Sequence, residues 1–330
     1  MNLIRKYFYS LMARQISTQR LLNRCNKPFV IHPLYHAVAN TYLPHITPLY
    51  QPKTFEKFKN DLDFFLQYFQ PVDVEDVLLH TTGEKRLTGN TFHLSFDGGL
   101  KEVYTIVLPY LYRKGIPATV FVNEDFVNNM QLFYRHKAAL IIDALTRKAP
   151  SPVVQKEIED RLSFPSKKTL REKVEAVSYS QRAVLDEIAS LLEIDLEQYL
   201  RNEKPYLTAK QLHEMRRKGF SIGGHGADHP YFPEITEEEQ IQQIVASISY
   251  VKRIAPDQHR CFAFPFTDAG ISDRVFQAIY RKNKRGPELT FGANGVGTSY
   301  GGRHIARIVM DSDGRNAKEI VNEALLKLPV

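Results

Sequence analysis

The stretch TFHLSFDGGL, residues 91–100, decides the first strand of the fold. Apolar and polar residues alternate from Thr91 to Phe96, and this period of two predicts a strand. The strand delivers Asp97 to its carboxyl end, where two glycines allow a sharp turn. A carboxylate in that position suits a general base or a metal ligand, although an aspartate that caps a helix or turn is the alternative interpretation.

Predicted strands and helices alternate along the chain after this stretch. Helical periodicity from Val103 to Lys114 ends at Gly115, and a short apolar run, Ile116 to Val122, reads as the next strand. From residue 206 onward strands and helices alternate again. This alternation predicts parallel strands with helices outside, that is, an α/β fold, although the pattern alone does not separate a barrel from an open sheet.

Two other parts of the chain do not show this alternation and are predicted to be helical. Residues 127–205 read as successive helices with prolines at their joints, and we expect a helical insertion that caps the strand ends. Residues 1–30 read as a helical leader. The domain prediction is therefore a leader, an α/β unit built from residues 31–126 and 206–330, and the insertion between its two parts.

A second candidate for chemistry is the segment HGADHP, residues 225–230, after the glycine-rich strand end SIGG. His225 and His229 lie four residues apart, and on one helical turn their side chains would point the same way. Neutral imidazoles so placed suit Zn²⁺ or a similar divalent ion. Two surface histidines at this spacing by chance are the alternative.

A third candidate is FAFPFTD, residues 262–268. We expect the aromatic and proline residues at the end of this apolar strand to wall a sugar-sized groove, because aromatic rings stack on the apolar faces of sugar rings. The three residues that we expect to bind substrate are Phe264, Pro265 and Phe266. A purely buried strand is the alternative interpretation of the segment.

The composition of the chain argues against nucleic acid as a partner and against insertion into a membrane. The chain has 330 residues, 43% hydrophobic and 25% charged, with a net charge of +7. Basic residues are scattered rather than clustered, which favours a solvated surface over a nucleic-acid interface. No apolar run is long enough to cross a membrane, and no export signal is evident, so we expect a cytoplasmic protein.

The N-terminal residues are a candidate for membrane contact. Leu3, Ile4, Tyr7, Phe8 and Leu11 share one face of a predicted helix, with basic residues opposite. Such a face could rest on an anionic membrane, which would give peripheral membrane association. Docking of the helix on the protein itself is the alternative that the pattern favours.

The three segments, in this order, resemble the motifs of the polysaccharide deacetylase (NodB-homology) family. SFDGG, HGADH and FAFPF stand where that family shows its TFDDG-like, HxxxH and proline–aromatic motifs. The connecting segments are also similar, including GIPATVF at 115–121 and YHAV at 35–38. The resemblance implies a distorted (β/α) barrel and the removal of N- or O-acetyl groups, by amide or ester hydrolysis, from a polysaccharide, an oligosaccharide or an amino-sugar glycan. It also implies a divalent metal ion, zinc first, with Asp97 as general base and His225 and His229 as ligands.

The chain departs from the family pattern at the expected metal site. Gly98 occupies the position of the aspartate that usually supplies the third ligand. Asp268 is the replacement that we predict, and Asp228 is a second candidate. Two hypotheses therefore stand: a metal-dependent deacetylase with a reorganised site, and a catalytically silent relative that binds glycan or a partner protein.

The arginine of the third motif is absent as well. We predict a strand from Ile305 to Met310. Arg307 on this strand could approach Asp97 and orient it, so we predict a catalytic role for Arg307 beside Asp97. No late histidine is an evident general acid, since His304 precedes its strand.

Overall fold

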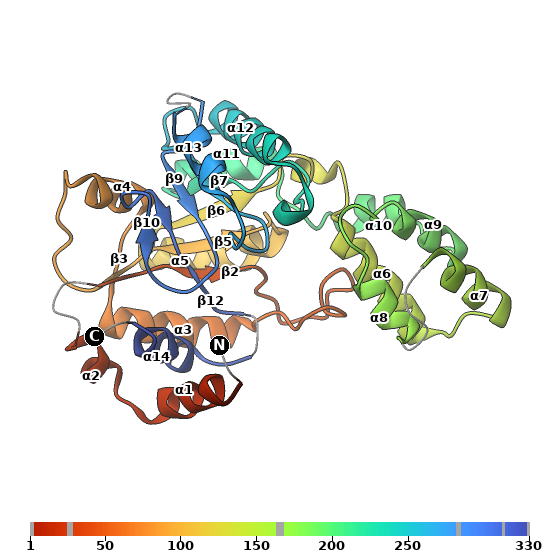
Figure 1. Cartoon of the computed structure of the whole chain (residues 1–330), viewed down its shortest axis with the longest axis horizontal. Helices are drawn as coiled ribbons and strands as arrows, with labels where there is room; N and C mark the ends of the chain where they lie inside the picture. Colours follow the sequence, from red (N-terminus) through yellow and green to blue (C-terminus); the bar gives the residue numbers. More distant parts are fainter. Residues whose placement is uncertain (1–2, 25–28, 163–167, 282–284, 312–313, 329–330) are drawn as a thin grey trace.

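A curled, mostly parallel sheet forms a half-barrel within the larger part of the protein (Figure 1). The computed structural model describes residues 3–24, 29–162, 168–281, 285–311 and 314–328. The sheet has the strand order β10-β11-β9-β8-β7-β6-β5-β2-β12, and only the β10–β11 pair is antiparallel. Its strands are β2 (Pro33–Tyr35), β5 (Leu94–Asp97), β6 (Ala118–Val122), β7 (Ser221–Gly224), β8 (Cys261–Ala263), β9 (Leu289–Phe291), β10 (Thr298–Ser299), β11 (His304–Ile305) and β12 (Ile308–Val309).

Helices pack outside this sheet, as the strand–helix alternation predicted (Figure 1). Three short strands, β1 (Val30–Ile31), β4 (Thr91–Phe92) and β3 (Gln70–Pro71), form a small second sheet. In the chain, β4 comes directly before β5, and β3 lies between the first two outer helices. The outer helices are α3 (Phe55–Tyr68), α4 (Val74–Thr82), η1 (Val103–Val107), α5 (Leu108–Lys114), α11 (Ala209–Arg217), η3 (Phe232–Glu234), α12 (Glu237–Ile254), α13 (Asp273–Arg281) and α14 (Ala317–Leu326).

Local signals in the sequence set the ends of several helices. Thr208 and Gln211 form a capping box at the start of α11, and Thr236 and Glu239 form one at the start of α12. Gly115 ends α5 in the left-handed conformation, with φ 65°. These interactions join residues three or four positions apart, which is why the sequence predicts them.

The predicted strand from Ile305 to Met310 is divided in two by the structure. Strand β11 pairs with β9, whereas β12 pairs with β2 at the opposite end of the sheet. Residues 306 and 307 thus cross between the two edges of the curled sheet, and Arg307 lies at that crossing. The prediction of one strand was wrong because the two halves pair with β9 and β2, which lie near opposite ends of the sheet and which only the curl of the sheet brings close.

Residues 127–205 form helices apart from the half-barrel, and their described part contains no strand (Figure 1). Their apolar side chains build a separate core around Ile141, Ile158 and Ile188. The loop after β2 ties the two parts together: Tyr42 donates to Asp143, and Pro48 accepts from Arg171. The helices are η2 (Val127–Asn129), α6 (Tyr134–Arg147), α7 (Pro152–Arg161), α8 (Leu170–Glu175), α9 (Val184–Leu191) and α10 (Leu196–Glu203).

The N-terminal helices α1 (Leu3–Gln15) and α2 (Thr18–Leu22) lie against α14 (Figure 1). Asn322 of α14 donates to the carbonyl oxygens of Ala13 and Ile16 and accepts from Thr18. The side chains of residues 1–8, which hold most of the predicted apolar face, lie outside the described part. None of the described helices is both long enough and apolar enough to span a membrane.

Candidate active site

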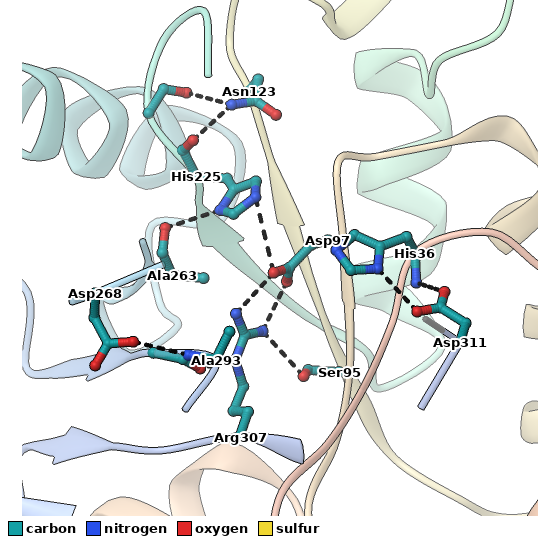
Figure 2. A network of polar contacts seen from close by, with 12 residues as sticks. His36, Ser95, Asp97, Asn123, His225, Ala263, Asp268, Ala293, Arg307 and Asp311 are labelled. Atoms are coloured by element: carbon teal, nitrogen blue, oxygen red, sulfur yellow. Dashed lines mark hydrogen bonds and ion pairs between the residues drawn. The ribbon is translucent and has the colours of Figure 1, made fainter. Parts of the chain in front are cut away.

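Asp97 stands at the carboxyl end of β5 and is held by Arg307 (Figure 2). The two terminal nitrogens of Arg307 each donate to a different carboxylate oxygen of Asp97, both at 2.7 Å. Arg307 also donates to Ser95 Oγ at 3.2 Å and to the Gly292 carbonyl oxygen at 3.0 Å. Both side chains are buried, so this pairing fixes the Asp97 carboxylate in one orientation.

The electrostatics of the pair keep Asp97 ionised. Burial by itself would raise the pKa of the Asp97 carboxyl, but the adjacent Arg307 guanidinium outweighs it and holds that pKa below its ordinary value. The charged carboxylate can therefore accept a proton at neutral pH.

His225 and His229 lie in a loop after β7, not on a helical turn as predicted. Asn123 shapes this loop by donating to the carbonyl oxygens of His225 at 2.6 Å and Gly226 at 3.1 Å. Gly226 and His229 both have positive φ, 79° and 58°. The two imidazole rings nevertheless meet, with centroids 4.7 Å apart, because the turn brings the chain back on itself.

Close packing explains why Gly223 and Gly224 precede the two histidines. A Cβ at Gly223 would collide with the Phe121 ring, and one at Gly224 would collide with Ser247. Strand β7 can therefore approach its neighbours only without side chains at these two positions.

The hydrogen bonds of His225 define its protonation. Its Nδ1 lies 2.8 Å from the Ala263 carbonyl oxygen, which can only accept, so Nδ1 carries the proton. Its Nε2 faces the Asp97 Oδ2 at 3.8 Å (Figure 2). Burial lowers the pKa of both His225 and His229, which keeps the two rings neutral. The Nδ1 of His229 is buried and has no hydrogen-bond partner among the described residues.

The side chains at this site do not fit a catalytic zinc ion with three protein ligands. No group of three histidine, cysteine, aspartate or glutamate residues within the described chain could hold a metal ion. Both oxygens of Asp97 are bound by Arg307, and Gly98 has no side chain to offer. Two imidazoles remain, which is one ligand fewer than such sites need.

The two aspartates considered as replacements are bound elsewhere. Asp268, predicted as a metal ligand, accepts from His304 Nε2 at 3.0 Å, Asn294 Nδ2 at 2.7 Å and the Ala293 backbone at 3.0 Å. These contacts lower the pKa of Asp268 to about 2 against the opposing effect of burial. Asp228 accepts from Tyr179 at 2.6 Å and from Gln243 at 3.1 Å. Neither lines the cavity that Asp97 faces.

That cavity has a volume of about 390 Å³. It is also lined by His36 and Asp311, which were not predicted from the sequence as site residues. The Asp311 carboxylate accepts from the His36 backbone at 2.6 Å and lies 3.0 Å from the His36 Nδ1 (Figure 2). Burial opposes the charge on His36, but Asp311 outweighs it and raises the pKa of the imidazole. His36 directly follows β2, so the same strand-end signal that marked Asp97 could have found it.

Comparison with known proteins agrees with this architecture. The family model described as polysaccharide deacetylase matches residues 84–284, more than half of the chain. The chain belongs to the polysaccharide deacetylase family. Among curated proteins, none matches the chain.

Solved structures of deacetylases share the fold. The Streptococcus pyogenes deacetylase PplD, solved in complex with acetate, is 15% identical and aligns with a TM-score of 0.56 over 91% of this chain and 97% of its own. IcaB from Ammonifex degensii is also 15% identical, with a TM-score of 0.56 over 90% and 97%. A de-N-acetylase from Aggregatibacter actinomycetemcomitans is 14% identical, with a TM-score of 0.53 over 88% and 97%. At this level of identity the similarity shows the fold of this deacetylase family member, a half-barrel.

The aromatic segment of this family member is divided between core and cavity. Phe266 lines the cavity, is 42% exposed and lies 4.6 Å from the His229 ring centroid. Phe264 is buried against Phe232 and Phe276, and Pro265 is buried as well. Of the three predicted substrate-binding residues, only Phe266 lines the cavity, because β8 ends at Ala263 and the positive φ of Phe266, 57°, turns its ring outward.

Proposed function

We propose that this protein removes acetyl groups from an acetylated polysaccharide or amino-sugar glycan by hydrolysis of a carbon–nitrogen bond. The observation that carries the proposal is the placement of two different proton-transfer groups on one cavity. Asp97 is held ionised by Arg307, while His36 is paired with Asp311. Hydrolysis of an amide needs one group that takes a proton and another that gives one.

The chemistry follows from these two groups. Asp97 accepts a proton from a water molecule as the water oxygen attacks the acetyl carbonyl carbon. The tetrahedral intermediate then breaks its carbon–nitrogen bond, and His36 donates a proton to the leaving nitrogen. Acetate and a free amine result. Arg307 positions Asp97, and Asp311 both orients His36 and favours its protonated form.

The divalent ion that the family resemblance implies has two candidate ligands here, His225 and His229, and Gly98 where a third would stand. We therefore assign the steps above to side chains of this chain. The His225 Nε2 faces Asp97 and can accept a hydrogen bond from the attacking water, because the proton of this ring is on Nδ1. The neutral His229 ring lies against that of His225.

Acetate release from acetylated chito-oligosaccharides tests the proposal. The wild-type protein should release acetate, and Asp97→Asn and His36→Gln should each slow release by about a hundredfold or more. Asp257→Asn is the matched control, because this aspartate is exposed and pairs with Arg216 outside the cavity. Equal rates in the wild type and Asp97→Asn would refute the proposal.

A second candidate function is glycan binding without hydrolysis. Gly98 favours it, since the family's metal-ligand carboxylate is missing at that position. Saturable binding of the same oligosaccharides with no acetate release would support this alternative.

A further inference from the structure

The cavity that Asp97 faces has an unusual balance of apolar and charged groups. Its walls are largely apolar, formed by Leu49, Leu100, Phe126, Phe133, Phe266 and Val309. Such a wall suits the faces of sugar rings and the methyl of an acetyl group. A few polar groups then fix the orientation of the ligand, as in most small-molecule sites.

The two carboxylates that line the cavity are already neutralised. Asp97 receives both terminal nitrogens of Arg307, and Asp311 receives two donors from His36.

Arg135, from the first turn of α6, is the one arginine or lysine among the cavity-lining residues that the structure describes. Its Nη1 donates to the Glu175 carbonyl oxygen at 2.5 Å. In the described ranges, no carboxylate oxygen lies within ion-pair distance of its guanidinium. Two other basic residues of α6 do have such partners: Lys137 pairs with Asp186, and Arg147 pairs with Asp143. A guanidinium has five N–H groups, so most of its donors remain for a ligand.

We propose that Arg135 makes this site specific for acetylated sugars that carry an anionic group, a carboxylate or a phosphate. This inference rests on the proposed deacetylation and adds the class of substrate to it. The cavity's own carboxylates are matched by cations, so Arg135 supplies unmatched positive charge beside an apolar wall. The planar guanidinium binds carboxylate or phosphate oxygens through two parallel hydrogen bonds. The insertion thereby contributes the specificity, while the half-barrel contributes Asp97 and His36.

Three probes test the proposal: methyl N-acetylglucosaminide, which is neutral, N-acetylmuramic acid, which carries a carboxylate, and N-acetylglucosamine 1-phosphate. Wild type should deacetylate at least one anionic probe with kcat/KM about tenfold or more above the neutral one. The better of the two anionic probes distinguishes carboxylate from phosphate as the recognised group.

Variants of Arg135 assign the preference to this residue. Arg135→Met should abolish the anionic preference, so that kcat/KM for the anionic probes falls to the value for the neutral probe in the same variant, and Arg135→Lys should keep part of the preference. Arg147→Met is the control, because it removes the same charge from the exposed end of α6. It should leave kcat/KM for all three probes unchanged. Equal kcat/KM for all three probes in the wild type, or a preference that survives in Arg135→Met, would overturn the anion site and leave the proposed hydrolysis intact.

Binding measurements separate the two proposals if no probe is hydrolysed. The absence of hydrolysis would refute deacetylation of these sugars, and isothermal titration of the wild type would then measure how tightly each of the same probes binds. Tighter binding of an anionic probe, lost in Arg135→Met and partly kept in Arg135→Lys, would still support the anion site. Equal dissociation constants for the three probes would overturn it.

Discussion

Arg307 and Asp97 form a bidentate ion pair in the interior although 210 residues separate them in the chain. Arg307 reaches Asp97 because it sits where the chain crosses between the two edges of the curled sheet. Arg307 therefore links the segment between β11 and β12 to the candidate base at the end of β5.

The Arg307–Asp97 pair should be strongly coupled in stability. We expect Arg307→Met to lower the free energy of unfolding by about 3–5 kcal/mol, because it leaves a buried carboxylate without its partner. The double variant Asp97→Asn, Arg307→Met should cost clearly less than the sum of the single changes. Urea unfolding of the four proteins measures this coupling, and additive costs to within about 0.5 kcal/mol would contradict it.

The pH dependence of deacetylation should report the His36–Asp311 pair. Asp311 raises the pKa of His36 above its ordinary value, and the proposed donor must be protonated. Activity should therefore fall as pH rises through that raised pKa. Asp311→Asn removes the raising charge and leaves burial, so the alkaline limb of kcat/KM should move to lower pH.

The acidic side of the same profile belongs to Asp97. Because Arg307 holds the pKa of Asp97 below its ordinary value, activity should persist on acidification until the pH approaches that lowered pKa. His36→Gln serves as the control, since it should remove the alkaline limb and keep the acidic one. An alkaline limb that stays in place in Asp311→Asn would exclude His36 as the donor.

Substitution at Gly98 should change metal affinity. Gly98 lines the cavity, and a Cβ built there meets no atom within 4 Å. Gly98→Asp would add a carboxylate next to the two imidazoles, and we expect zinc and cobalt to bind at least about tenfold more tightly than to wild type. The φ of 87° should cost roughly 1–3 kcal/mol of stability, although aspartate tolerates positive φ better than most residues.

Gly98→Asn is the matched control for this prediction, because it has nearly the same shape and the same backbone strain but no charge. Metal titration followed by calorimetry or cobalt absorption measures the effect. Tight stoichiometric zinc in the wild type would show that another residue supplies the third ligand. Equal affinities of the Asp and Asn variants would show that the carboxylate does not reach the imidazoles.

Two phenylalanines separated by one residue should behave differently. Phe266→Ala should raise KM for oligosaccharides several-fold with little loss of stability, because the ring lines the cavity and is partly exposed. Phe264→Ala should cost about 3–5 kcal/mol of unfolding free energy, because it empties a buried site among aromatic rings. Thermal unfolding and steady-state kinetics of both variants check this, and a stability loss in Phe266→Ala as large as that in Phe264→Ala would contradict it.

The sequence by itself determined features that depend on near neighbours in the chain. The alternation at residues 91–96, the capping boxes that begin α11 and α12, and the turn at Gly115 join residues a few positions apart. The order of the three motifs indicated the family, and the end of β5 indicated Asp97. Such signals are readable because local hydrogen bonds and side-chain alternation are fixed by the sequence around them.

Only the tertiary structure decided which distant groups meet. The curl of the sheet divided the predicted strand at Arg307, placed His36 against Asp311, and left Asp268 with His304 instead of the two predicted zinc histidines. Asn123, on the neighbouring strand's loop, shaped the turn that brings His225 and His229 together without a helix. These contacts join residues tens to hundreds of positions apart, and their geometry depends on how strongly the whole sheet bends, which no local pattern encodes.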